Sequence, residues 1–435
     1  MRKNILAILS LGAISAAGLN AADAATYYLS TAGQDNPNKS GSANAPFATF
    51  WYAQKFLTAG DTLIVKSGTY SRSSGNDFVI TVSGNDTSGD ITFLADPAGP
   101  TRPVIVGNNT GSAITIGGSH IVVSGFNATA GDSNSSYTLS AIQIGNGSPI
   151  HHVKVMHNQA YHSGCAGIQS SHADYLTIER NSVFRNSSVS EKQCSGIDIG
   201  FGSAYDTKAG YHNYIIANWT FENTNVTPVT STSSDPHNGH TTDGSGIILD
   251  TFNTNGYSGG ATLIMSNVSY ANGGSGIRVF QSTGVDVINN TVYGNNQDAN
   301  QYTSATSAGH GEIYVTTATD VHTYNNIAVV ASPKLTATYA LLDRDTNGGV
   351  YDHNCIVGGT QQFTLSGYSY PSWQYQLEQD PQFVKPSLDP SVANFALQST
   401  SPALNAGDYA YIPAAPYNVD LNLQSFSNPP NMGAY

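Results

Sequence analysis

The sequence predicts an all-β chain that folds as a single-stranded right-handed parallel β-helix, with an N-terminal capping helix and a C-terminal wrap. Two repeating features predict this fold. A short motif recurs along the chain, as in AIQI from residue 141, GIDI from 196 and GIRV from 276. Downstream, an apolar alternation ends in asparagine seven times, at Asn158, Asn181, Asn218, Asn267, Asn290, Asn326 and Asn354. Internal repeats of this kind indicate a solenoid whose repeats stack on one another.

The spacing between the two features is constant in several repeats. Ile168 and Asn181 are 13 residues apart, and the same distance separates Ile114 from Asn127, so we expect Asn127 to be an eighth member of the asparagine series. Short strands with alternating apolar side chains, separated by turns rich in Gly, Asn and Ser, fit one coil of a β-helix. Asparagines buried at the same turn of each coil can pair their amides from coil to coil. We therefore expect a ladder.

The remaining elements follow in chain order. Residues 1–24 combine a basic start, a short apolar run and a small-residue cleavage site, which predict a secretory signal peptide. The β-helix is expected over residues 25–375, and it begins with apolar groups at helical spacing in residues 45–60, which predict an amphipathic helix over the first coil. The period is lost after about residue 375, so residues 376–435 are expected to form a C-terminal capping segment over the last coil.

Composition narrows the choice of partners. Only 10% of the residues are charged, and the formal net charge is -13. An acidic chain argues against nucleic acid as the partner, and the one apolar run is short for a membrane span. We expect a secreted monomer, extracellular or periplasmic, that acts on an extracellular polysaccharide and binds neither nucleic acid nor membrane.

The three cysteines leave one question open. Cys165 and Cys194 occupy nearly the same place in successive coils, so they can form a disulfide in an exported protein or stay as buried thiols. Cys355 follows the last ladder asparagine and is expected in the core. No spacing of cysteine and histidine resembles a zinc site.

Insertions mark one column of strands. Ten residues separate a ladder asparagine from the next strand isoleucine in regular coils, but 29 separate Asn218 from Ile247 and 23 separate Asn290 from Ile313. Insertions in repeat proteins collect on the binding face, and loops on a rigid scaffold supply most functional residues. We therefore expect a groove along the strands between residues 196 and 316.

Strand alternation identifies the side chains that face this groove. The outward and rim positions are Asp198, Asp250, Arg278, Phe280, Glu312 and Tyr314, with Asp243 and His240 just before the strand that carries Asp250. Charged residues are scarce in this chain, yet several gather here beside the longest insertions. The structural alternatives are an exposed ion pair between Asp250 and Arg278 without functional consequence, and a turn role for Asp243 before Gly244.

The chain resembles a known superfamily at both ends and in the central coils. The start YYLSTAGQDNPN…AGDTLIVKSGTY and the close DPQFV…SPALNAGD…NMGAY are similar to those of secreted right-handed parallel β-helix proteins of the pectate lyase-like superfamily. The resemblance implies a polysaccharide lyase or a related enzyme. In one pectate lyase family a DGNGFK-type strand supplies a catalytic lysine beside aspartate-bound Ca²⁺. Here Ile248 stands at that lysine position, and Arg278 on the next coil is the nearest cation.

The leading hypothesis is β-elimination on a uronate-containing polysaccharide. This reaction removes the proton at C5 and stabilises the charge that develops on the uronate carboxylate. Arg278 is expected to act as the base or the charge stabiliser, with Asp243 and Asp250 as its catalytic partners. Possible Ca²⁺ held by Asp198, Asp243 and Asp250 would neutralise the carboxylate.

Five side chains are expected to bind the substrate: Asp198, Phe280, Glu312, Tyr314 and His240. Aromatic faces at Phe280 and Tyr314 suit the stacking of sugar rings. Two other functions stay open. A glycoside hydrolase would use Asp243 with Asp250 or Asp198 as its acid and base, and a non-catalytic protein would only bind glycan in the same groove.

Overall fold

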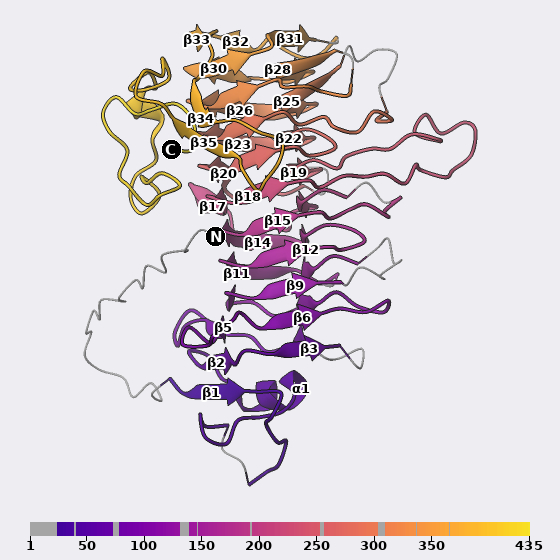
Figure 1. Ribbon diagram of the computed structural model, residues 1–435, viewed down its shortest axis with the longest axis vertical. Coiled ribbons are helices and arrows are strands. Elements are labelled where there is room, and N and C mark those ends of the chain that lie inside the picture. The colour runs from indigo at the N-terminus through magenta and orange to yellow at the C-terminus, as the bar shows by residue number, and fades with distance from the viewer. Residues whose placement is uncertain are drawn as a thin grey trace.

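The computed structural model shows a solenoid whose coils stack along one axis (Figure 1). The predicted signal peptide lies outside the described residues except for Ala24. The structure describes residues 24–38, 41–72, 78–130, 139–145, 147–191, 194–252, 256–302, 309–335, 337–364 and 366–435. No helix among these residues is long and apolar enough to cross a membrane.

Three long parallel sheets form the walls of the solenoid. The twelve-stranded sheet contains β1 (Thr26–Leu29), β2 (Thr62–Val65), β5 (Ile91–Ala95), β8 (Ile121–Ser124), β11 (Ile150–Met156), β14 (Ala173–Glu179), β17 (Tyr211–Ile216), β20 (Ala261–Met265), β23 (Thr283–Ile288), β26 (Thr319–Tyr324), β29 (Val350–Asp352) and β32 (Ser372–Trp373), in that order. The ten-stranded sheet contains β4 (Val79–Ile80), β7 (Ile114–Ile116), β10 (Ile142–Ile144), β13 (Ile168–Ser171), β16 (Ile197–Gly200), β19 (Ile247–Asp250), β22 (Ile277–Phe280), β25 (His310–Thr316), β28 (Thr338–Arg344) and β31 (Thr360–Phe363). The eleven-stranded sheet contains β3 (Thr69–Ser71), β6 (Val104–Val106), β9 (Asn127–Thr129), β12 (Gln159–Tyr161), β15 (Ser182–Phe184), β18 (Trp219–Phe221), β21 (Val268–Tyr270), β24 (Thr291–Tyr293), β27 (Ile327–Val329), β30 (Asn354–Val357) and β33 (Gln376–Leu377).

Aliphatic columns fill the interior. In the ten-stranded sheet, Ile197 pairs in register with Ile247, which pairs with Ile277. All three are fully buried, because alternate side chains of a strand point to the same face. The short motif of the sequence is thus a stack of identical side chains in the core.

The predicted asparagine ladder is present. The Oδ1 atom of Asn290 accepts hydrogen bonds from the backbone N (3.0 Å) and Nδ2 (2.9 Å) of Asn267 in the preceding coil. The same pair of bonds joins every neighbouring pair from Asn158 to Asn354. Each rung therefore satisfies a buried backbone N–H as well as the side-chain amides.

The prediction that Asn127 is an eighth member of this ladder is wrong, because the ladder position lies one residue earlier. Phe126 stands at the ladder position, because its backbone N donates to Oδ1 of Asn158 at 2.9 Å. Asn127 pairs instead with Gln159, the residue after the ladder asparagine. Its half-exposed side chain lies outside the ladder.

A second ladder, which the sequence analysis missed, runs five residues after the first. Its members are Asn186, Asn223, Asn272 and Asn295, all buried. Asn272 donates from its backbone N (3.1 Å) and Nδ2 (2.8 Å) to Oδ1 of Asn295. A Cβ on Gly276 would lie 2.6 Å from Nδ2 of Asn295, and Gly167, Gly196 and Gly246 stand equally close to the other members. Still closer side-chain atoms, such as Cγ1 of Val292 at a Cβ on Gly276, add to this contact, and together they explain why glycine opens the GI motif.

Glu312 ends the second ladder, so the prediction that it faces the groove is wrong. Its carboxylate accepts from the backbone N (3.0 and 3.1 Å) and Nδ2 (2.7 Å) of Asn295, and the side chain is fully buried. Glu312 occupies the position that glycine holds in earlier coils, directly before the strand isoleucine. Its side chain extends toward Asn295 of the second ladder. In the next coil Ala331, five residues after Asn326, supplies no amide. The carboxylate takes over the acceptor role of the missing asparagine.

The N-terminal cap is shorter than the predicted helix over residues 45–60. The structure has α1 (Phe50–Ala53) followed by the 3₁₀ helix η1 (Gln54–Phe56), and the Thr49 side chain caps α1. The preceding segment is extended, because Phe47 forms a bridge with Leu29 of β1. The ring of Phe50 still packs 5.1 Å from that of Phe93, so the cap covers the first coils as expected.

The C-terminal wrap is present, but it lies along the side of the solenoid and not over the last coil (Figure 1). It contains the antiparallel pair β34 (Phe383–Lys385) and β35 (Asn394–Leu397) and the 3₁₀ helix η2 (Tyr409–Tyr411). Its backbone carbonyls accept hydrogen bonds from turns of several coils: from Arg180 to Leu421, from Asn289 to Gly433 and from Asn325 to Asp408.

The structure decides between a disulfide and two buried thiols for Cys165 and Cys194. Cys165 and Cys194 form a disulfide between successive coils, with their Cα atoms 5.3 Å apart. Cys355 is a buried free thiol, as expected. Its Sγ donates to the backbone carbonyl of Gln379 at 3.3 Å, which ties the start of the C-terminal segment to the solenoid.

Glu312 predicts how stability depends on pH. Burial raises the pKa of Glu312 to about 8, although its bonds with Asn295 lower it. A carboxyl with a raised folded-state pKa stabilises the fold in its protonated form, so its contribution is full below the ordinary pKa of 4.5 and is lost as the pH rises through about 8. Glu312→Gln keeps an acceptor and cannot ionise, so we expect a higher urea midpoint than wild type at alkaline pH and no difference at acidic pH.

Glu312→Ala is the matched variant. It leaves the backbone N–H of Asn295 without an acceptor, which costs roughly 1–3 kcal/mol for a buried unsatisfied group, while Nδ2 keeps its bond to the Ser269 carbonyl. We expect this loss below about pH 8 and a smaller difference from wild type above it, where the Glu312 contribution is itself lost, as measured by urea unfolding. Equal pH profiles for wild type and Glu312→Gln would contradict the assignment.

Candidate active site

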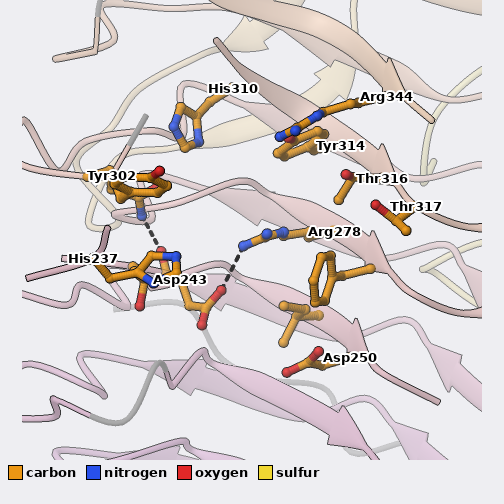
Figure 2. Close-up of a pocket in the computed structure, with 14 residues that line it drawn as sticks. His237, Asp243, Asp250, Arg278, Tyr302, His310, Tyr314, Thr316, Thr317 and Arg344 are labelled. Atoms are coloured by element: carbon orange, nitrogen blue, oxygen red, sulfur yellow. Dashed lines mark hydrogen bonds and ion pairs between the residues drawn. The ribbon is translucent and has the colours of Figure 1, made fainter. Parts of the chain in front are cut away.

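A cavity of about 300 Å³ opens on the outer face of the ten-stranded sheet, in the coils with the longest insertions (Figure 2). It is lined by His237, Thr242, Asp243, Ile248, Asp250, Arg278, Phe280, Gln301, Tyr302, His310, Tyr314, Thr316, Thr317 and Arg344. The structure thus brings five of the predicted site residues together: Asp243, Asp250, Arg278, Phe280 and Tyr314.

Two columns of the sheet form the floor of the cavity. Arg278 is in register with Ile248 on one side and Tyr314 on the other. Phe280 is in register with Asp250 and Thr316 in the neighbouring column. Coils lie about 4.8 Å apart, so these side chains are within reach of one sugar unit.

Two insertions form one wall. The insertion before β19 and the insertion before β25 meet at a parallel bridge between Thr241 and Gln301. Thr241 donates its backbone N–H to Asn300 at 3.1 Å, and Tyr302 donates to Thr241 at 2.8 Å. The side chain of Gln301 in turn donates to the backbone carbonyl of Asp243. The wall therefore holds Asp243 and Tyr302 against the sheet.

Arg278 lies at the centre of the cavity. Its Nη1 donates to Oδ1 of Asp243 at 2.7 Å, and the guanidinium carbon lies 5.0 Å from the Phe280 ring centroid and 5.4 Å from that of Tyr314. Its side chain is 23% exposed, and Nε has no hydrogen-bond partner. The guanidinium is therefore fixed in position, and its unpartnered Nε is itself buried.

The two carboxyls beside Arg278 both have raised pKa values. Burial raises the pKa of Asp243 to about 6, the Arg278 charge lowers it, and Asp250 raises it further. Burial also raises the pKa of Asp250, against the effect of Arg278 and a hydrogen bond with Thr251. Asp243 has a positive φ of 55°, as expected for a turn residue, and it also lines the cavity. The turn interpretation and the functional one are thus compatible.

Three predicted site residues lie outside the cavity lining. Asp198 is in register with Ile248 but is only 7% exposed, and burial, Asp250 and Asp243 raise its pKa well above the ordinary value. Glu312 is the buried end of the second asparagine ladder. His240 is exposed in the inserted loop, with its ring 5.9 Å from that of Tyr302.

The three aspartates fit a calcium site poorly in this arrangement. Ca²⁺ takes several oxygen ligands at 2.3–2.6 Å, so the carboxylates that hold it must converge. Among the described residues, the one group of three or more His, Cys, Asp or Glu with ligand atoms within 4.8 Å of one another consists of histidines. Asp243 also already uses an oxygen for Arg278. Calcium binding by Asp198, Asp243 and Asp250 stays a prediction.

His310 is a functional candidate that the sequence did not single out. Burial and the nearby charge of Arg278 lower the pKa of His310 to about 4, and a hydrogen bond with the backbone of Tyr302 raises it. Nε2 is buried and has no hydrogen-bond partner. The imidazole is therefore neutral at neutral pH and keeps the Nε2 lone pair for a ligand.

Arg344 was also missed in the sequence analysis, although its spacing from the strand residue Leu341 identifies it as a residue of the cavity floor column. It follows Leu341 of β28 by three residues, as Asp250 follows Ile247 and Phe280 follows Ile277. It is in register with Thr316 and lies three coils beyond Asp250 in the same column. Arg344 lines the cavity together with Arg278, so the cavity holds two arginines (Figure 2).

Comparison with solved structures identifies the fold. Pectate lyase Pel9A aligns with a TM-score of 0.53 and 18% identity over 94% of this chain and 96% of that chain. A glycoside hydrolase aligns with a TM-score of 0.49 and 9% identity over 86% of this chain and 99% of that chain. A rhamnogalacturonan lyase aligns with a TM-score of 0.38 and 13% identity over 86% of this chain and 96% of that chain. The first likeness confirms the right-handed parallel β-helix and extends to no activity. No protein-family model and no curated protein sequence matches the chain.

The ion pair of Asp243 and Arg278 predicts a pH-dependent variant. Arg278→Gln leaves Asp243 buried without its cation, so the folded-state pKa of Asp243 rises above about 6. The variant should match wild type at acidic pH, where the carboxyl is protonated, and lose stability as the pH rises through that value. Loss of a charged hydrogen bond suggests roughly 1.5–3 kcal/mol. Thermal unfolding of both proteins across pH checks this, and a loss independent of pH would contradict it.

Proposed function

We propose that the chain is a secreted polysaccharide lyase that cleaves a uronate-containing polysaccharide by β-elimination in this cavity. The observation that carries the proposal is the free Nε2 of buried His310 in the same cavity as Arg278 and Arg344. A neutral base and two fixed cations are the groups that this reaction needs. The fold shared with pectate lyase Pel9A is in keeping with the proposal.

The reaction assigns a role to each group. His310 accepts the proton from C5 of the uronate at Nε2, the C4–O4 bond breaks as the C4=C5 double bond forms, and the leaving oxygen takes a proton from water. Negative charge develops on the uronate carboxylate, and the guanidinium groups of Arg278 and Arg344 stabilise it through charge-assisted hydrogen bonds. Arginine stays protonated in proteins, so Arg278 acts as charge stabiliser and not as base.

An anionic substrate also improves the base. The positive charge of Arg278 is one cause of the low pKa of His310. A uronate carboxylate bound to Arg278 offsets that charge, so the proton affinity of Nε2 rises when the substrate is in place. Phe280 and Tyr314 form the apolar floor beneath the sugar ring.

Glycoside hydrolysis is the second candidate, favoured by the raised pKa of two carboxyls on the cavity. Asp243, with a pKa of about 6, can hold a proton for a leaving group. Asp250, whose pKa is also raised, lies on the same floor. This pair would leave new reducing ends without a double bond.

The test is a panel of uronate-containing and neutral polysaccharides, with and without a chelator. We expect ultraviolet absorbance from an unsaturated uronate, and we expect His310→Ala to lower kcat by roughly 10²–10⁴-fold, the usual contribution of a general base. Arg185→Ala, which removes a half-exposed arginine paired with Glu222, is the control and should keep full activity. Loss of activity with the chelator would support calcium.

Other outcomes decide between the candidates. Reducing ends without absorbance, together with an inactive Asp243→Asn variant, would select the hydrolase. Binding of a polysaccharide without any product would select the non-catalytic protein. Full activity of His310→Ala would overturn the assignment of the base.

The pH profile of kcat/KM gives a further prediction. This ratio reports groups of the free enzyme, and the pKa of His310 there is about 4. The base is active when unprotonated, so we expect the acid limb of the His310-dependent rate well below the ordinary histidine range. Arg278→Gln removes one cause of the low pKa and should move this limb to higher pH. An unmoved limb would contradict the coupling.

A further inference from the structure

Three histidines cluster at a corner of the solenoid, away from the lining of the cavity. They are His120, which precedes β8, and His151 and His152 in β11. One ring nitrogen from each lies within 4.8 Å of the others. His120 is 6% exposed, and the other two are half-buried. The cluster plays no part in the function proposed above.

The nearest pair has nearly the separation of two metal ligands. The Nδ1 atoms of His151 and His152 are 2.9 Å apart, and their rings are nearly perpendicular at 86°. Two nitrogen ligands of a tetrahedral Zn²⁺, each about 2.0–2.1 Å from the ion, lie about 3.3 Å apart, which is a few tenths of an ångström more than this separation. An ion can therefore replace the shared proton that otherwise joins these two nitrogens.

His120 is the third nitrogen ligand. Its ring stacks on that of His152 at a centroid distance of 4.5 Å and an angle of 5°. An imidazole lone pair lies in the ring plane, so two parallel rings cannot point at one ion. Rotation of the His120 ring about its Cβ–Cγ bond is therefore part of metal binding.

Oxygen ligands lie beside His120. Oδ1 of Asp86 is 3.5 Å from its Nε2, and Oδ1 of Asp90 is 3.4 Å from its Nδ1. Lys154 neutralises the other oxygen of Asp90 at 2.8 Å. Mixed imidazole and carboxylate donors suit a borderline ion such as Zn²⁺ better than Ca²⁺.

Neighbouring rings hold the histidines in place. Tyr205 stacks on His151 with a centroid distance of 3.7 Å, and Tyr175 stacks on His152 at 4.4 Å. Ligands whose side chains are already ordered lose less entropy when an ion binds.

We propose that His120, His151 and His152, with a carboxylate from Asp86 or Asp90, form a site for Zn²⁺ or a similar divalent transition-metal ion. The two aspartates precede β5, His120 precedes β8, and the other two histidines belong to β11, so the ligands come from three successive coils. The ion cross-links these coils and stabilises the N-terminal part of the solenoid, because it binds the folded chain and not the separated ligands.

The experiment uses the untagged full chain, freed of metal with a chelator that is then removed. Titration calorimetry with Zn²⁺ should give one ion per chain, and Zn²⁺ should raise Tm by several degrees, whereas Ca²⁺ at the same concentration should leave Tm unchanged. His151→Phe and His152→Phe keep the ring stacks and remove a ligand each, and each should weaken Zn²⁺ binding by at least about 10-fold, in line with 10- to 100-fold losses for lesser changes at metal sites.

His353→Ala is the control variant. His353 has a positive φ of 49°, as His120 (56°) and His152 (55°) do, but it lies on a C-terminal coil. It should bind Zn²⁺ as wild type does. Absence of Zn²⁺ binding by the wild-type chain would overturn the proposal, as would binding unchanged in folded His151→Phe and His152→Phe. Circular dichroism of each variant establishes that it is folded.

Discussion

The pairing of asparagine with glycine across the interior corner is the constraint on which the rest of this structure depends. Each asparagine of the second ladder fills the space that a Cβ on the glycine before the strand isoleucine would need, as Asn295 does at Gly276. Neither residue can change alone without a clash or an unsatisfied amide. Together with the first ladder, this contact fixes where each coil turns. The register of the ten-stranded sheet follows from it.

The register of the ten-stranded sheet determines which side chains lie next to one another on the floor of the cavity. With the turns fixed, Arg278 must stand beside Tyr314, and Phe280 beside Asp250. Variation is left to the segments between the ladders and the strands, where the insertions before β19 and β25 build the wall. The second ladder ends at the same coil, where Glu312 replaces glycine two residues after His310. The regular scaffold and the irregular site therefore meet within one strand, β25.

The features that could be predicted from the sequence are those that repeat at a fixed spacing along the chain. The fold, the first ladder and the columns that hold Arg278 and Phe280 all follow from such spacing, and Arg344 would have followed had the register been carried one coil further. Glu312 could not be placed by alternation, because its side chain, although it belongs to β25, lies inside against the Asn295 donors. The second ladder was hidden because asparagine is common in turns.

Contacts that insertions make, or that join different coils, could not be predicted, because no pattern in the neighbouring sequence indicates them. The sequence does not show that the backbone of Tyr302 contacts His310, because Tyr302 lies within an insertion of irregular length. His120 and His151 are 31 residues apart, a spacing that resembles no metal motif, yet stacking of one coil on the next places them together.

The C-terminal segment has a consequence for how such chains change in evolution. Solenoids vary in length by the duplication or loss of whole repeats. Here the segment is bound to turns near Arg180, Asn289 and Asn325, which lie on different coils. A coil added between these turns would displace every later attachment by one coil spacing, whereas one added before Arg180 would leave them aligned. The number of coils is thus free to drift toward the N-terminus and is locked in the half that holds the cavity.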